Sequence, residues 1–312
     1  MSKLFFISAL IFLFSTAIYA QSSSVYQRFI QNGKYGYKTA DGEIVLKPKY
    51  DYAGEFNEGR AIVASSDYNY LNYGIIDENF SEIVDLEHSY IGDYSEGLAK
   101  VKIGSFKLFR DYYKWGYFNR DGEIAIEPKF ESVGDFHEGL AYFYESDKNL
   151  LNVFSKKVIR YGFINRQGII VIEPLYDKAS NFSEGLAPVK FDNKRGYINK
   201  FNEFVIPPKF KAAEVFSNSL ALAMTDSLYG YINLDGEYEI EPQFKKAKRF
   251  SEGLALVEIN NKWGYINSQG KTIIDPIYEA GTKFVNGIAK VTLEGKDLLI
   301  NIRGKRINRV EN

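Results

Sequence analysis

The chain has 312 residues, with 39 lysines and arginines against 40 aspartates and glutamates, and no cysteine. Balanced charge argues against nucleic acid as a partner, because phosphate backbones select clustered positive surfaces. The lack of cysteine excludes disulfides and a lipid-modified cysteine anchor, so stability has to come from core packing, for which the chain is long enough. The 24 tyrosines and 24 phenylalanines favour strands and also suit recognition surfaces.

Residues 1–20 have the layout of a cleavable secretory signal. Lys3 supplies the positive start, residues 4–17 are apolar, and Ala20 ends a run of small residues. The apolar run is too short to span a bilayer comfortably, which favours a cleaved signal. An uncleaved membrane anchor is the alternative. We therefore expect cleavage after Ala20, a mature domain of residues 21–312 without a transmembrane segment, and a secreted or periplasmic location.

Two short elements recur along the rest of the chain, which indicates tandem repeats. The first element combines aromatic residues around a glycine: KYGYKT (34–39), NYGIID (72–77), KWGYFN (114–119), RYGFIN (160–165), KRGYIN (194–199), LYGYIN (228–233) and KWGYIN (262–267). The second element is a turn-like run: FNEGRA (56–61), YSEGLA (94–99), FHEGLA (136–141), FSEGLA (182–187), FSNSLA (216–221), FSEGLA (250–255) and FVNGIA (284–289). A proline lies between the two elements in six of the seven repeats: Pro48, Pro128, Pro174, Pro208, Pro242 and Pro276.

The spacing within each repeat is constant. In every repeat that has the proline, the same number of residues separates the first-element glycine from the proline, and the proline from the turn element. Gly264, Pro276 and Gly287 are one example. The step from a turn glycine to the next first element is also constant in the later repeats, as from Gly253 to Gly264. It is longer after each of the first three repeats, where it runs over 59–74, 97–116 and 139–162. The basic period is therefore about 34 residues, and insertions fall at a single junction.

Together these runs resemble the bacterial WG (KWG) repeat, over about residues 25–310. The chain departs from the pattern at three places: Arg195 in place of an aromatic residue, Leu86 in place of a proline, and Asn218-Ser219 in place of Glu-Gly. The resemblance implies a β-rich domain of about seven full repeats and a degenerate C-terminal unit at 297–307, and it brings no catalytic residues.

Each repeat predicts a short series of strands and turns. The first element alternates as a strand, with a glycine that lets a neighbour pack closely, and its Asn-x-x-Gly ending predicts a type I turn closed by a left-handed glycine. A second strand follows, and we expect the proline to end its pairing. Tyr176, Ala179 and Phe182 lie three residues apart and predict a helical or 3₁₀ turn. Ser-Glu-Gly makes the next turn, and a third strand follows, as at 254–259.

The fold class follows from this unit. A three-stranded meander cannot bury its own face, so neighbouring units have to complete a shared core. Residues 25–31 fall in the register of a third strand, which gives eight units in all. Because a propeller blade usually has four strands and about 40 residues or more, we predict an all-β, open, twisted β-solenoid of three-stranded repeats, with a closed β-propeller-like ring as the alternative.

The search for chemistry finds repeated positions rather than a unique site. His88 occupies a slot that is aromatic in the other repeats, His137 occupies a turn slot, and neither has a partner at metal-ligand spacing. The turn glutamates recur once per repeat, whereas a catalytic acid is needed once, so we expect them to bond within their turns. No phosphate-binding or calcium-binding loop is present. We therefore predict no catalysis, no metal and no cofactor.

The three insertions are expected to project from one edge, because they share one junction. They cover residues 64–72, 102–114 and 144–160. The second carries the candidate partner-binding residues Phe106, Phe109, Arg110, Tyr112 and Tyr113. Aromatic and arginine side chains are typical of binding hot spots, although the insertions could simply lengthen hairpins with alternate aromatics facing inward.

The sequence thus predicts a scaffold that binds a protein, a peptide or a surface glycan. A structural envelope protein that assembles through its end units is the first alternative, although the cationic last unit has the character of a polar cap. An enzyme on a propeller-like frame is the second alternative, and it would need one deep pocket with a carboxylate pair that is not repeated.

Overall fold

The structure is a computed structural model, described over residues 25–67, 70–107, 110–146 and 158–307. Within these ranges the chain forms thirty strands in eight small antiparallel sheets and no helix. It follows that the described part of the chain offers no helix able to cross a membrane. The predicted signal, residues 1–20, lies outside the described ranges, so its cleavage and the location of the mature chain remain predictions.

The sheets follow one another in chain order. The first three consist of β1 (Tyr26–Gln31), β2 (Lys34–Thr39) and β3 (Ile44–Tyr50); β4 (Tyr52–Ala53), β5 (Arg60–Asp67), β6 (Tyr70–Asp77) and β7 (Glu82–His88); and β8 (Tyr90–Ser95), β9 (Leu98–Lys107), β10 (Arg110–Phe118) and β11 (Ile124–Phe130). The fourth and fifth consist of β12 (Ser132–Val133), β13 (Leu140–Ser146), β14 (Ile159–Asn165) and β15 (Ile170–Tyr176); and β16 (Lys178–Ala179), β17 (Ala187–Phe191), β18 (Lys194–Ile198) and β19 (Phe204–Phe210). The last three consist of β20 (Ala212–Ala213), β21 (Ala221–Met224), β22 (Tyr229–Ile232) and β23 (Tyr238–Phe244); β24 (Ala255–Ile259), β25 (Lys262–Ile266) and β26 (Thr272–Tyr278); and β27 (Ala280–Gly281), β28 (Ile288–Leu293), β29 (Lys296–Asn301) and β30 (Arg306–Ile307).

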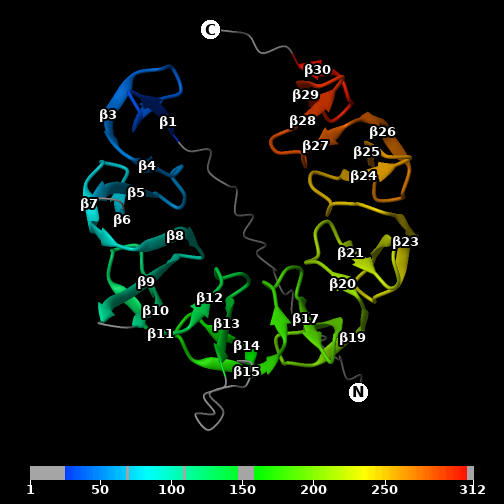
Figure 1. Ribbon diagram of the computed structural model, residues 1–312, viewed down its shortest axis with the longest axis horizontal. Coiled ribbons are helices and arrows are strands. Elements are labelled where there is room, and N and C mark those ends of the chain that lie inside the picture. Colours follow the sequence, from blue (N-terminus) through cyan, green and yellow to red (C-terminus); the bar gives the residue numbers. More distant parts are fainter. Residues whose placement is uncertain (1–24, 68–69, 108–109, 147–157, 308–312) are drawn as a thin grey trace, which may run out of the picture.

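The eight sheets lie around an arc (Figure 1). In the fourth sheet, for example, the short first strand β12 lies on the inner side of the arc and the proline-bearing strand β15 lies on the outer side. The first sheet and the last sheet form the two ends of the arc and face each other across its opening (Figure 1).

The hydrophobic core lies between consecutive sheets. Seven clusters of buried side chains occur in the described residues, and each joins one sheet to the next along the chain. In one of them, Tyr197 and Phe210 of the fifth sheet pack against Phe216 and Ile232 of the sixth. This nearest-neighbour packing confirms the predicted all-β array of tandem repeats, which is solenoid-like and open between its end sheets.

The connector between repeats is extended, so the predicted helical turn is wrong. β16 pairs with β17 through Lys178↔Lys190 and Ala179↔Val189, which adds a short fourth strand to the inner edge of the predicted meander. The three-residue spacing has a different cause: Tyr176, Phe182 and Ala179 all contribute to the cluster between the fourth and fifth sheets.

The proline does not end the outer strand, which is a second correction. In β19, Ile206 pairs with Tyr197 and Phe210 pairs with Arg195, and a bulge lies between the two pairs. Pro208 falls within this bulge, where its missing N–H removes no ladder bond. The predicted close approach at the glycine is confirmed, because a Cβ on Gly196 would lie 2.5 Å from the Ile206 oxygen.

The turns after the first element have the predicted form. The N–H of Gly236 donates to the carbonyl of Asn233, and Gly236 has a φ of 82°. The Asn233 side-chain oxygen also accepts the N–H groups of Asp235 and Glu237. Asparagine is therefore preferred here because one side chain satisfies two backbone donors of a turn.

Candidate functional site

Buried tyrosines hold five of the connectors against the preceding sheet. The hydroxyl of Tyr197 is fully buried and donates to the backbone oxygen of Glu214 at 2.7 Å. The equivalent bonds run to the residue 17 positions later from Tyr37, Tyr117, Tyr231 and Tyr265. Burial raises the pKa of the Tyr197 hydroxyl, so it stays a donor at neutral pH. The backbone on the inner side of the arc is thus fixed by the same bond in five repeats, whereas Ile75 and Phe163 replace the tyrosine in the other two.

The turn glutamates link successive turns. Glu58 and Gly59 have φ values of 53° and 78°, the combination that defines a type I′ hairpin turn. The Glu58 carboxylate accepts the N–H of Gly97, in the next turn, at 2.8 Å. The same contact recurs from Glu96, Glu138, Glu184 and Glu252. The predicted structural role is therefore correct, but the bond joins neighbouring repeats rather than lying within one turn.

This contact explains one departure from the repeat pattern. Glu184 accepts the N–H of Ser219, which stands where other repeats have glycine. Only a backbone donor is needed at that position, so serine preserves the bond despite its φ of 61°. A second link runs beside it, where the Ser183 hydroxyl donates to the Phe216 oxygen at 2.8 Å.

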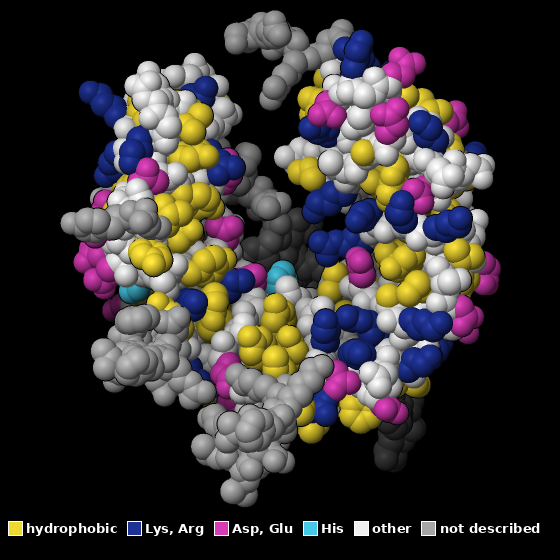
Figure 2. Space-filling model, viewed as in Figure 1, with side chains coloured by type: hydrophobic (Ala, Val, Ile, Leu, Met, Phe, Trp, Pro, Cys, Tyr) yellow, Lys and Arg dark blue, Asp and Glu magenta, His cyan; other side chains and the backbone are white. Residues whose placement is uncertain are grey.

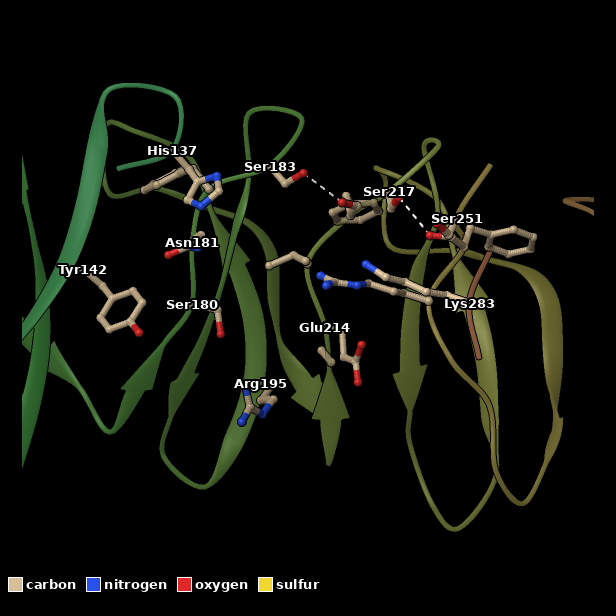
Figure 3. A pocket seen from close by; sticks show the side chains of 16 residues that line it. His137, Tyr142, Ser180, Asn181, Ser183, Arg195, Glu214, Ser217, Ser251 and Lys283 are labelled. Carbon is tan, nitrogen blue, oxygen red and sulfur yellow. Dashed lines mark hydrogen bonds between the residues drawn. The ribbon is translucent and has the colours of Figure 1, made fainter. Parts of the chain in front are cut away.

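A cleft of about 730 Å³ lies on the inner side of the arc, across the fourth to the eighth sheet. The residues that line it are His137, Tyr142, Ser180, Asn181, Phe182, Ser183, Arg195, Ala213, Glu214, Val215, Phe216, Ser217, Arg249, Phe250, Ser251 and Lys283. His137, Ser183, Ser217 and Ser251 form a row along one side, and Glu214 lies across from them (Figure 3). The cleft is thus built largely from the connectors and turns that the repeated bonds hold in place.

One position of the connector changes its charge along the arc. It directly precedes the buried aromatic residue of the turn element and is occupied in order by Glu55, Asp93, Asp135, Asn181, Val215, Arg249 and Lys283. Basic side chains accordingly gather on the inner side of the later half of the arc, and hydrophobic ones are more evident on the earlier half (Figure 2). The same backbone position is therefore acidic at one end of the arc and basic at the other.

The cations that line the cleft are unpaired. Among the described residues, Arg195, Arg249 and Lys283 take part in no ion pair and no side-chain hydrogen bond. Glu214 is the one carboxylate in the described lining. The Asn181 side-chain oxygen is buried and has no hydrogen-bond partner in the described structure. The site thus combines positive charge with unused acceptor groups.

The earlier half of the inner side has the opposite character. Arg28 pairs with Glu55 at 2.8 Å, and Lys100 pairs with Asp135 at 3.1 Å. Burial and the nearby Asp135 charge raise the pKa of Asp93. Beside these groups the rings of four residues follow one another at 5.4–6.0 Å: Tyr52, Tyr73, Tyr90 and Trp115. Two of the three acidic connector residues of this half, Glu55 and Asp135, are therefore paired within the protein.

The predicted binding edge lies elsewhere. β9 and β10 extend into the second insertion and pair up to Lys107↔Arg110, at the opposite end of β9 from its turn with β8. The ring of Tyr113 lies 4.2 Å from the Lys102 ammonium. Phe106, Arg110 and Tyr112 lie on these two strands, and Phe109 lies outside the described residues. The role of these residues in binding stays a prediction.

The two histidines occupy the predicted slots. His88 packs against Phe118 with ring centres 5.2 Å apart, and burial lowers its pKa. His137 lies in a turn and is exposed at the cleft. The described residues contain no cluster of three potential metal ligands. The sequence shows Arg195 as a departure from the repeat pattern, but it did not lead us to predict the cleft. The signal that could have revealed the cleft is the change from Glu55 to Lys283 at the equivalent connector position of successive repeats.

Fold and site together define an all-β tandem-repeat domain with a polar inner cleft. The chain belongs to the WG containing repeat family, which it matches at residues 35–65, 73–105, 115–148, 161–194, 196–229, 229–263 and 263–296. None of the curated proteins compared with it matches the chain.

Several solved structures resemble the arc. One described as a eukaryotic initiation factor is 8% identical, with a TM-score of 0.58 over 91% of this chain and 85% of that one. A functionally unknown protein from Desulfotomaculum acetoxidans is 13% identical, with a TM-score of 0.39 over 86% of this chain and 99% of that one. Prolyl oligopeptidase B from Galerina marginata is 10% identical, with a TM-score of 0.49 over 82% of this chain and 49% of that one. The first likeness concerns the fold alone.

Proposed function

We propose that this protein is a non-catalytic scaffold, secreted or periplasmic, that binds a protein, peptide or glycan partner on the inner side of its arc. One observation carries the proposal. The contacts that build the arc recur from repeat to repeat, whereas the residue that each connector presents changes from Glu55 through Val215 to Lys283. A variable surface on a constant frame is what recognition by a repeat protein requires.

The lining of the cleft supports binding over catalysis. Hydrolysis of a glycosidic bond needs two carboxylates on either side of the scissile bond. Glu214 stands without a second carboxylate in the described lining of the cleft. The turn glutamates are already engaged by backbone N–H groups, as Glu58 is by Gly97. The polar groups of the cleft therefore suit orientation of a ligand better than acid–base chemistry.

The export part of the proposal depends on residues 1–20, whose composition is that of a signal. Expression of the full chain in the native bacterium, followed by fractionation and N-terminal sequencing, tests it. We expect a mature protein that begins at Gln21 in the periplasm or the medium. A cytoplasmic protein with an intact N-terminus would contradict the proposed location but not the binding role.

The binding role is tested by capture from envelope extract on immobilised mature protein. Two variants separate the two candidate surfaces: deletion of 103–112, in the predicted edge, and the double reversal R249E/K283E, in the cleft. We expect saturable capture by the wild type and by the deletion, and loss of capture by the reversal. Loss by the deletion alone would move the site to the predicted edge, and no saturable capture by the wild type would overturn the scaffold proposal.

A further inference from the structure

We propose that the inner cleft binds an extended acidic segment of a partner protein. This inference rests on the proposed scaffold function and adds the site and the chemistry of the ligand. It starts from three cations, Arg195, Arg249 and Lys283, which line one cleft and have no partner among the described residues.

The contrast with the earlier repeats shows that these cations are not part of the frame. At the same connector position Glu55 and Asp135 pair with Arg28 and Lys100. Arg249 is exposed and unpaired at that position, although the backbone beside it is held by the same bond, from Tyr231 to the Lys248 oxygen. The frame tolerates either charge, so the positive charge of the cleft is free to serve a ligand.

Arg195 strengthens the argument from a different position. It stands before the glycine of the first element, where the other repeats carry an aromatic residue: Tyr35, Tyr73, Trp115, Tyr161, Tyr229 and Trp263. The chain therefore replaces its own repeat signature in the fifth sheet, at a residue that lines the cleft. A guanidinium group binds a carboxylate through two parallel hydrogen bonds, which makes an anionic ligand the natural partner.

Other groups of the cleft can accept hydrogen bonds. The Ser183, Ser217 and Ser251 hydroxyls each donate to a backbone oxygen of the next repeat, which leaves their lone pairs available. An extended acidic peptide carries both kinds of group that this cleft can bind. Its acidic side chains can pair with the cations, and its backbone N–H groups can donate to the acceptors.

The aromatic residues of the cleft argue for a peptide rather than a glycan or a nucleic acid. Phe182, Phe216 and Phe250 are each 1% exposed, so their faces are closed to a ligand. Among the phenylalanine and tyrosine side chains of the described lining, Tyr142 alone is more than slightly exposed. Sugar rings and bases are usually held by stacking on exposed aromatic faces, which this cleft does not offer in series.

The direct test measures the fluorescence anisotropy of a labelled peptide of alternating glutamate and serine against the mature protein. We expect saturable binding that weakens as salt is raised, because the charges of the cleft are exposed to solvent. The matched lysine–serine peptide should not bind. The R249E/K283E variant should bind at least about tenfold more weakly, which corresponds to about 1.4 kcal/mol.

Two further variants keep the result interpretable. R195Y restores the aromatic residue of the other repeats, so it should fold normally and bind the acidic peptide more weakly. K271E/R303E changes the net charge as much as R249E/K283E, but at exposed turn residues that do not line the cleft, and should bind as the wild type does. The thermal unfolding of each variant, followed by circular dichroism, confirms that the fold is intact.

Each contrary result has one meaning. Equal weakening by K271E/R303E would reduce the effect to net charge and overturn the cleft assignment. Binding of oligogalacturonate in place of the peptide, with the same loss in R249E/K283E, would replace the acidic peptide by an anionic glycan and leave the scaffold function standing.

Dimers that sediment without peptide and dissociate in R249E/K283E would assign the cleft to a second copy of this chain. Capture from envelope extract that survives R249E/K283E and R195Y would overturn the cleft alone, whereas absence of any capture would overturn the scaffold function.

Discussion

The two halves of the inner side share one backbone and differ in what they present. In the first half the Glu55 carboxylate lies 2.8 Å from Arg28, so its charge is satisfied within the protein. In the second half Arg249 and Lys283 occupy the equivalent position without a partner in the described structure. The difference teaches that the bonds that build a repeat and the residues that vary from repeat to repeat lie on separate parts of the unit.

The end sheets show the same separation. Leu256 packs in the last inter-sheet cluster, and the equivalent residue one repeat later, on the last sheet, is Lys290, which pairs with Asp297 at 2.7 Å. At the other end Gln27 stands where Ala289 is buried in the eighth sheet, and Gln27 is exposed. Polar residues therefore replace core residues on the outer faces of the two end sheets, which pack against one neighbouring sheet instead of two.

The strongest test of a common frame is the glycine of the first element. A Cβ on Gly36 would lie 2.4 Å from the Leu46 oxygen, and one on Gly264 would lie 2.7 Å from the Ile274 oxygen. Because both contacts are with backbone, we expect Gly36→Ala and Gly264→Ala each to lower the free energy of unfolding by about 3 kcal/mol. Urea unfolding measures both.

Gly33→Ala is the control for the glycine test, since a Cβ on Gly33 would meet nothing within 4 Å. Its positive φ of 76° still makes alanine unfavourable, by about 1 kcal/mol. A loss at Gly36 or Gly264 no larger than that at Gly33 would show that the close approach is not what fixes these residues.

The turn glutamates sharpen the comparison, because the two halves should respond unequally. Glu58 accepts the Gly97 N–H at 2.8 Å and also pairs with Arg120 at 2.6 Å, whereas Glu252 accepts the Gly287 N–H at 2.8 Å. We expect Glu58→Ala to cost about 2 kcal/mol and Glu252→Ala about 1 kcal/mol. Thermal unfolding in low and high salt checks this, since only the Arg120 part of the loss should shrink with salt. Equal losses of stability in Glu58→Ala and Glu252→Ala that do not change with salt would show that the ion pair of Glu58 with Arg120 contributes nothing.

Much of this molecule could be predicted from the sequence because the period is strict. The three longer strands of each repeat, the turn that begins at Asn233 and the eight units follow from alternation and spacing alone. The extended connector at Lys178–Ala179 could not be predicted, because a short strand that packs between two sheets spaces its buried residues much as a helical turn does. The cleft is a property of several repeats at once, and no single repeat contains the chemistry that Arg195, Arg249 and Lys283 form together.

The smallest expected effect concerns the buried tyrosine hydroxyls, one from each half. Tyr37 donates to the Gly54 oxygen at 2.8 Å and Tyr265 to the Thr282 oxygen at 2.9 Å. We expect Tyr37→Phe and Tyr265→Phe each to cost about 1 kcal/mol at pH 8, the usual net value of one hydrogen bond. Two natural repeats support the modest size, since Ile75 and Phe163 already occupy this position.

The pH dependence of that loss distinguishes a buried hydroxyl from a merely well-packed ring. Burial raises the pKa of both hydroxyls, so the neutral form is favoured in the folded protein. Their contribution is therefore complete below the unfolded pKa of about 10 and declines as the pH rises above it. In urea unfolding, the difference in free energy of unfolding between the wild type and each Phe variant should shrink above pH 10 and vanish at about pH 11. Tyr70→Phe, at a residue that is 79% exposed, should match the wild type throughout. A deficit that persists unchanged at pH 11 would mean that the hydroxyls ionise equally in both states, and that their bonds do not hold the connectors of either half.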